Sequence, residues 1–85
     1  MKPIVIYTKP TCGFCFMAKR LLTEKGARFV EVDITRNPGE RGTMIQLANG
    51  RTTVPQIFIG GSHVGGFDDL NALDRAGKLD GVLAA

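Results

Sequence analysis

The chain has 85 residues, of which 44% are hydrophobic and 22% charged, and its net charge is +3. These values predict one small globular domain over residues 1–85, and no apolar run is long enough to cross a membrane as a helix. The basic residues are scattered rather than clustered, so we expect no binding to nucleic acid; the first apolar run is too short for a secretory signal, so we expect a cytoplasmic protein.

The first part of the chain predicts a strand, a helix and a second strand. Residues 3–8 predict a strand, and the continuous apolar run at residues 4–7 is typical of a central one. Apolar residues then recur at helical spacing over residues 13–25, and Gly26 suits the end of that helix. Residues 28–33 alternate between apolar and polar, which predicts a short second strand.

The rest of the chain predicts a helix, a hairpin and a last helix. Pro38 suits the first position of a helix that runs to about residue 49. Residues 56–65, with two glycines at their centre, read as a β-hairpin, and Asp68-Asp69 reads as the cap of a helix ending at Gly77. The order β-α-β-α-β-β-α predicts an α/β protein with a four-stranded mixed sheet and three helices.

Cys12 and Cys15 are the only cysteines, and they lie where the first strand gives way to the first helix. Residues three apart on a helix share a face, so the two sulfurs can come within disulfide-forming distance. The free N–H groups at a helix start stabilise a thiolate, the reactive form of cysteine. The pattern predicts a redox-active dithiol. The alternatives are two inert cysteines or a metal site, although a closed zinc site needs about four ligands and only His63 could add to the cysteines.

Two further segments accompany the cysteine pair. They are Thr53-Val54-Pro55-Gln56-Ile57-Phe58-Ile59 and Gly65-Gly66-Phe67-Asp68-Asp69-Leu70. With these segments and the C-G-F-C motif, the sequence resembles a glutaredoxin of the short bacterial dithiol type over essentially its whole length. The resemblance implies a thioredoxin fold in which Pro55 follows a cis peptide bond beside the two cysteines.

The resemblance also implies an enzyme, a glutathione-dependent thiol–disulfide oxidoreductase that acts on protein disulfides and glutathione mixed disulfides. Cys12 would be the nucleophile and Cys15 the resolving partner in a redox-active disulfide, with glutathione as the reductant and no metal required. We expect a monomer. The residues that would bind glutathione are Lys9, Phe14, Arg41, Thr53, Val54, Pro55, Gly66, Asp68 and Asp69.

The charges of glutathione suggest how such a site would be divided. By the resemblance, Lys9 and Arg41 face the glycyl carboxylate, although solvated surface charges are the alternative for both. The N–H groups of Asp68 and Asp69 open a helix and would hold the γ-glutamyl carboxylate, and an aspartate side chain there would take the ammonium group. His63 is interpreted as a hairpin side chain away from these motifs rather than as a base.

The residues between the cysteines depart from the commoner dithiol pattern, which has Pro and Tyr where this chain has Gly13 and Phe14. Phe14 keeps an aromatic ring without the hydroxyl, and Gly13 is more flexible than proline. By the resemblance, a small residue after the first cysteine favours a [2Fe–2S] cluster held between two subunits. The alternative function is therefore a cluster scaffold or carrier, a homodimer in which Cys12 of each chain and two glutathione molecules are the ligands.

Overall fold

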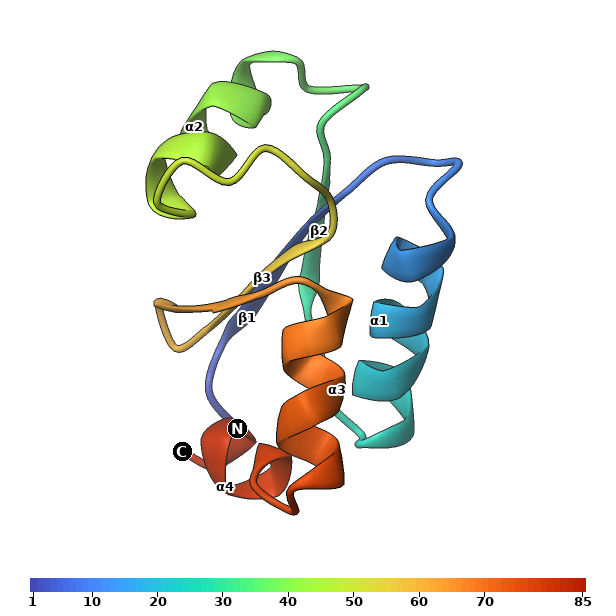
Figure 1. The fold of residues 1–85 in the computed structure, drawn as a ribbon, viewed down its shortest axis with the longest axis vertical. Helices are drawn as coiled ribbons and strands as arrows, with labels where there is room; N and C mark the ends of the chain where they lie inside the picture. Colours follow the sequence, from blue (N-terminus) through green and yellow to red (C-terminus); the bar gives the residue numbers. More distant parts are fainter.

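The computed structural model describes residues 1–85 and contains four strands and four helices (Figure 1). The strands are β1 (Ile4–Thr8), β2 (Val30–Asp33), β3 (Gln56–Ile59) and β4 (Ser62–Gly65). The helices are α1 (Gly13–Glu24), α2 (Gly39–Leu47), α3 (Phe67–Arg75) and α4 (Leu79–Leu83). The predicted order is confirmed as far as α3. None of the helices has the length and apolar character needed to span a membrane.

The predicted count of three helices is one too low, because the short α4 follows α3. This helix has five residues, too few for a helical period to show in the sequence. Its Leu79 and Leu83 are both buried. The N–H of Lys2 donates to the Leu83 carbonyl at 2.9 Å, so α4 also brings the two ends of the chain together.

The sheet has the strand order β2-β1-β3-β4. Strand β1 pairs in parallel with β2, Tyr7 lying opposite Val32, and antiparallel with β3, Tyr7 lying opposite Gln56. Strand β4 completes the predicted hairpin with β3. The predicted mixed sheet with a central first strand is thus confirmed, and the tip of β1 is placed beside the start of β3.

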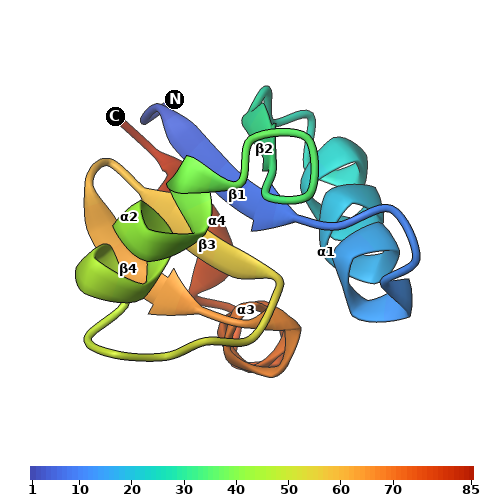
Figure 2. The ribbon, with the colours of Figure 1, turned by 90° about the horizontal axis from the view of Figure 1, so that it is seen from above.

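The sheet is covered on both faces (Figure 2). Neighbouring side chains on a strand point to opposite faces, and the core is divided accordingly. Ile4 and Ile6 belong to the larger cluster, which lies against α1, α3 and α4, while Tyr7 belongs to a smaller one with Met44 of α2 and Phe58. Helix α1 therefore crosses one face of the sheet with its first turn beside the end of β1.

The inward face of α1 differs from the one that the apolar spacing indicated. The buried residues are Cys15, Ala18 and Leu22, whereas Phe14 is 58% exposed and Met17 is 45% exposed. The cysteine takes an inward position in the first turn, so the neighbouring large apolar residues face outward. Phe14, which the resemblance placed among the glutathione-binding residues, accordingly lies on the outward side of the helix.

Two helix starts also differ slightly from prediction. Pro38 is the cap of α2 rather than its first residue. The cap of α3 is Gly66, not the Asp68-Asp69 pair, and the Asp69 carboxylate accepts a hydrogen bond from the Gly66 N–H at 2.9 Å. A carboxylate at the third helical position can reach back to the cap in this way. Asp69 therefore closes the helix start from inside the first turn.

Candidate active site

Cys12 is the cap residue of α1 and has an extended backbone. Its sulfur accepts a hydrogen bond from the Cys15 N–H at 3.1 Å and lies 3.7 Å from the carbonyl oxygen of Val54, to which the thiol can donate. The side chain is half-buried. The sulfur thus sits at the mouth of the helix, as the sequence predicted, and against the segment that precedes β3.

Cys15 lies one turn deeper, on the buried side of α1, with 1% of its surface exposed. Burial, followed by the hydrogen bond with Cys12, raises the pKa of the Cys15 thiol to about 12. Both cysteines are free thiols. The arrangement leaves Cys12 as the accessible sulfur and keeps Cys15 protonated near neutral pH.

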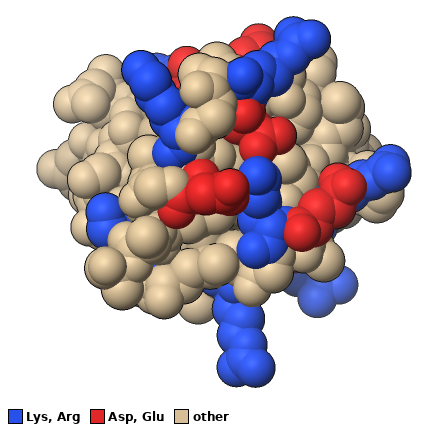
Figure 3. Space-filling view, turned by 90° about the horizontal axis from the view of Figure 1, so that it is seen from below, with Lys and Arg blue, Asp and Glu red and all other residues tan.

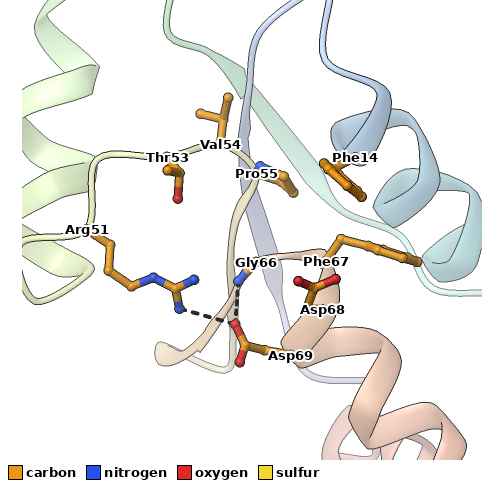
Figure 4. A pocket seen from close by; sticks show the side chains of 9 residues that line it. All are labelled: Phe14, Arg51, Thr53, Val54, Pro55, Gly66, Phe67, Asp68 and Asp69. Carbon is orange, nitrogen blue, oxygen red and sulfur yellow. Dashed lines mark hydrogen bonds and ion pairs between the residues drawn. The ribbon is translucent and has the colours of Figure 1, made fainter.

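A groove passes Cys12, made of two adjoining hollows that share Phe14, Thr53 and Val54. The hollow shown in Figure 4 is lined by Phe14, Arg51, Thr53, Val54, Pro55, Gly66, Phe67, Asp68 and Asp69. The other is lined by Lys9, Cys12, Gly13, Phe14, Ile34, Thr35, Arg41, Thr52, Thr53 and Val54. Every predicted site residue except Cys15 lines this groove, and Cys15 lies beneath it. The Val54–Pro55 peptide bond is cis, as the resemblance implied.

The sequence also matches proteins of known family. The glutaredoxin family model matches residues 4–64. The chain is 53% identical to the glutaredoxin of Pseudomonas aeruginosa over 85 residues, which is 100% of both chains. It is 53% identical to glutaredoxin 3 of Escherichia coli K12 over 83 residues, 98% of this chain and 99% of that protein. The chain belongs to the glutaredoxin family. It is an enzyme of the thiol–disulfide oxidoreductase class.

Solved structures of other glutaredoxins share the fold. A buckwheat glutaredoxin in complex with glutathione matches with a TM-score of 0.88 at 34% identity, over 96% of this chain and 76% of that one. The holo form of glutaredoxin C1 from Populus tremula x tremuloides matches with a TM-score of 0.86 at 34% identity, over 96% of this chain and 83% of that one. The thioredoxin fold that the sequence resemblance implied is confirmed.

At one end of the groove of this glutaredoxin, the start of α3 offers free backbone donors. The first hydrogen bond into this helix runs from the Leu70 N–H to the Gly66 carbonyl, so the three N–H groups before Leu70 have no helical partner. The Gly66 N–H and then Arg51 hold the pKa of the Asp69 carboxyl below its usual value. Asp68 is exposed and makes no side-chain hydrogen bond or ion pair. The two aspartates, paired in the prediction, therefore differ: Asp69 is engaged and Asp68 is free.

At the other end, the structure brings Lys9 and Arg41 to the same hollow. Lys9 follows β1 and Arg41 lies in the first turn of α2, and both are exposed. Arg41 could be placed from the sequence only through the position of α2, and the fold carries that helix to the groove. The groove thus has cations at one end and helix N–H groups at the other, with Cys12 between them.

Two groove residues escaped the sequence analysis. Arg51 bonds the Asp69 carboxylate at 3.1 Å, linking the segment before β3 to the start of α3 (Figure 4). Phe67 stacks on Phe14, with ring centroids 6.3 Å apart and an angle of 23° between the rings. In the sequence, Arg51 could have been noticed because it stands just before the Thr53-Val54-Pro55 motif. Phe67 could have been noticed as an aromatic residue that directly follows two glycines.

The interpretation of His63 as a residue remote from the motifs is wrong. His63 does lie on β4, but its Nε2 atom is 2.7 Å from Oε1 of Gln56, the residue after Pro55. The register of the hairpin explains the contact. His63 pairs with Phe58, and its ring stacks on the Phe58 ring and extends toward the start of β3.

Proposed function

We propose that this glutaredoxin reduces glutathione mixed disulfides and protein disulfides in the cytoplasm, acting as a monomer with glutathione as the reductant. The observation that carries the proposal is that the groove has different charged and hydrogen-bonding groups on the two sides of Cys12. Glutathione has a carboxylate at each end and one ammonium group beside the γ-glutamyl carboxylate. The groove has Lys9 and Arg41 at one end, and free N–H groups with the unpaired Asp68 carboxylate at the other.

The chemistry needs one sulfur for a glutathione mixed disulfide. The Cys12 thiolate attacks the glutathionyl sulfur, the old S–S bond breaks, and the protein thiolate leaves and takes a proton from solvent. A second glutathione thiolate attacks the glutathionyl sulfur now bound to Cys12. Glutathione disulfide forms and the Cys12 thiolate is regenerated. One glutathione from solution is consumed and oxidised as the substrate sulfur is reduced, and the other half of the glutathione disulfide is the glutathionyl group taken from the substrate.

A protein disulfide requires both cysteines. Cys12 forms a mixed disulfide with one substrate sulfur and releases the other as a thiol. Cys15 loses its proton and attacks Cys12, which releases the substrate and leaves the Cys12–Cys15 disulfide for glutathione to reduce. The 3.1 Å contact between the Cys12 sulfur and the Cys15 N–H supports this step, because it keeps the two residues on one turn.

The groove residues have separate proposed roles in binding. Lys9 and Arg41 attract the glycyl carboxylate, and the Asp68 and Asp69 N–H groups bind the γ-glutamyl carboxylate at a helix start. Asp68 takes the ammonium group, because the Asp69 carboxylate is already bonded twice.

The remaining contacts come from the middle of the groove. Thr53, Val54 and Pro55 form an edge along which the glutathione backbone can lie extended. Phe14 forms one wall, and Gly66 lets the ligand approach the backbone closely. The buckwheat glutaredoxin–glutathione complex, which shares the fold, supports this use of the groove.

The test is a glutathione-coupled assay on a small glutathione mixed disulfide. Wild type should turn the substrate over with saturable dependence on glutathione. The Cys12→Ser variant should give only the uncatalysed rate. Turnover that proceeds equally well with a non-thiol reductant in place of glutathione would contradict the proposal.

A second candidate function, a [2Fe–2S] scaffold or carrier, is favoured by the surroundings of Gly13. This glycine lines the groove, and a Cβ added to it would meet no atom within 4 Å, so neither space nor a left-handed backbone requires glycine there. One chain offers no group of three side chains that could hold a metal ion. A cluster would therefore need Cys12 of two chains and two glutathione thiolates.

Reconstitution with iron, sulfide and glutathione tests this candidate. Wild type should become a coloured dimer with a visible absorption band. Gly13→Pro, which stiffens the approach to Cys12, should take up less cluster while keeping thiol transfer. Equal occupancy in the two proteins, or none in either, would contradict it.

A further inference from the structure

The segment 52–55 forms the middle of the groove, yet its backbone has almost no support of its own. It lies between α2 and β3 and belongs to neither. Of the 19 backbone hydrogen bonds outside the helices and strands, none involves residues 52–55. Backbone groups that lack such partners depend on side chains, water or a ligand. Something else must therefore fix the shape of this edge.

Gln56, the first residue of β3, supplies that support. Its side chain is wholly buried, with 0% of its surface exposed. Its Nε2 atom donates to the Thr53 carbonyl at 3.0 Å and lies 3.3 Å from the Thr53 hydroxyl oxygen. Burying an amide costs free energy unless its polar atoms form hydrogen bonds. These bonds therefore satisfy the Gln56 amide and, at the same time, fix the orientation of the Thr53 carbonyl.

The other end of the amide fixes the state of His63. Because Nε2 of Gln56 must face the Thr53 carbonyl, Oε1 faces His63, at 2.7 Å from its Nε2. An amide oxygen only accepts, so the hydrogen of that contact belongs to His63 Nε2. The imidazole ring is held in turn by stacking on Phe58, with centroids 5.0 Å apart. Donation therefore runs in one direction, from His63 through Gln56 to Thr53.

The hydrogen bonds that run from His63 through Gln56 end at Thr53, next to the reactive sulfur of Cys12. Thr53 and Val54 line both hollows of the groove, and the Val54 carbonyl is 3.7 Å from the Cys12 sulfur. A turn of the Thr53 peptide would move the next peptide, that of Val54, as well. We propose that Gln56 and His63 are positioning residues, which hold the Thr53–Pro55 edge in the shape that binds the extended backbone of glutathione; this inference rests on the proposed function.

Two variants and one control test the role. Gln56→Glu keeps the shape and the acceptor that faces His63 but replaces the donor to Thr53 with a carboxylate oxygen. His63→Phe keeps a ring that can stack on Phe58 and removes the donor. Gln46→Glu makes the same chemical change at an exposed position of α2 and is the matched control.

The kinetic readout separates positioning from folding. In Gln56→Glu, the KM for a glutathione mixed disulfide should rise about tenfold with kcat within about twofold of wild type; His63→Phe should give a rise of about threefold. Gln46→Glu should match wild type. A merely structural role would lower Tm and the folded fraction without raising the KM of the folded protein, which would overturn the proposal.

The NMR readout does not depend on activity. In wild type, the His63 ring should carry its hydrogen on Nε2, and the carbonyl-carbon shift of Thr53 should change in both variants but not in Gln46→Glu. A hydrogen on Nδ1 alone, or an unchanged Thr53 carbonyl, would overturn the proposal. If Gln56→Glu does not fold, the KM and the Thr53 carbonyl shift of His63→Phe test the positioning role instead. If wild type fails to use glutathione mixed disulfides, the proposed function fails and the Thr53 carbonyl still decides the positioning role.

Discussion

The two ends of the molecule satisfy their polar groups in different ways. At the end opposite the groove, Lys25 of α1's terminus bonds Asp74 of α3 at 2.8 Å and Asp80 of α4 at 3.1 Å. Charges of both signs are interspersed over that face (Figure 3). At the groove end, the Asp68 side chain has no partner, Phe14 is exposed, and residues 52–55 make no backbone–backbone hydrogen bond outside the regular elements.

This difference separates stability from function within one small fold. Where three helix ends meet, Lys25 forms ion pairs with Asp74 and Asp80, and these pairs join the helices. Around Cys12, donors, acceptors and the aromatic surface of Phe14 are left open to solvent, where a ligand can displace the water that occupies them. Substitutions at the groove end should therefore alter activity with little change in stability, and those at the opposite end should do the reverse.

Cys12→Ser should have the largest effect on activity of any variant that tests this difference between the two ends. Removing the accessible sulfur should lower thiol transfer by at least about a thousandfold, to the uncatalysed rate, because a serine hydroxyl is a poor nucleophile near neutral pH. Tm should stay within about 2 °C of wild type, since the side chain is half-buried and makes few contacts. Residual activity of a tenth or more would show that Cys15 is also accessible.

The next effect distinguishes the two cysteines within the groove end. Cys15→Ser should retain most activity on a glutathione mixed disulfide and lose about tenfold or more on a protein disulfide, because only the second reaction needs a resolving thiol. The two substrates are assayed side by side at the same glutathione concentration. Equal losses on both substrates would contradict the division of roles.

Stability against pH tests the burial of Cys15. Its folded pKa, about 12, lies above the ordinary value of 9.0, so the folded protein keeps a proton that the unfolded chain releases. The free energy of unfolding should therefore be unaffected by this group well below pH 9 and fall above it, by about 3 kcal/mol at pH 11.

Cys15→Ala is the matched variant for that measurement, which uses denaturant unfolding of the reduced proteins. Lysine and tyrosine titrations are common to both proteins and cancel in the comparison. The steeper decline of wild type should disappear in the variant. Parallel curves above pH 9 would mean that the Cys15 thiol ionises as easily in the folded protein as in the unfolded chain.

A smaller effect is expected at the basic end of the groove. Lys9→Gln and Arg41→Gln should each raise the KM for a glutathione substrate about threefold at low salt, and less at high salt because exposed charges are screened. Arg28→Gln removes an exposed cation just before β2 and is the control. If all three variants behave alike, the effect is one of net charge and not of the groove.

The smallest effect is expected on stability, at the end of the molecule opposite the groove. Lys25→Met should lower Tm by no more than about 5 °C, because partly exposed ion pairs contribute little and methionine retains the apolar stem. Both kcat and KM should equal those of wild type. A change in KM would show that the two ends are coupled and would break the contrast drawn above.

The sequence predicted most of the fold because its signals are local. The hairpin at residues 56–65 carries its own turn glycines, and the strand at residues 3–8 contains a continuous apolar run, so both were predicted nearly to the residue. Helix α4 was missed because five residues do not complete two turns. The inward face of α1 was misjudged at Met17, since apolar spacing alone cannot tell which apolar positions of a helix face the core.

The candidate site was predicted wherever a motif names its residues, as at Cys12 and Pro55. What escaped prediction are contacts between segments far apart in sequence. The Arg51–Asp69 pair depends on how α3 docks beside the segment before β3, and the His63–Gln56 contact depends on the register of the hairpin. Neither follows from the composition of either segment alone, because each is a product of tertiary packing.

The hydrogen bond from the Lys2 N–H to the Leu83 carbonyl has a practical consequence for handling this protein. It holds both ends of the chain together beside α4, at the end of the molecule opposite α2 and the loop between β1 and α1 (Figure 1). An affinity tag or fluorescent partner attached at either end would emerge on that far side and leave the groove open. A short linker between the ends would also allow the chain to be reopened at the exposed Gly60–Gly61 turn, a circular permutation that leaves the groove loops uncut.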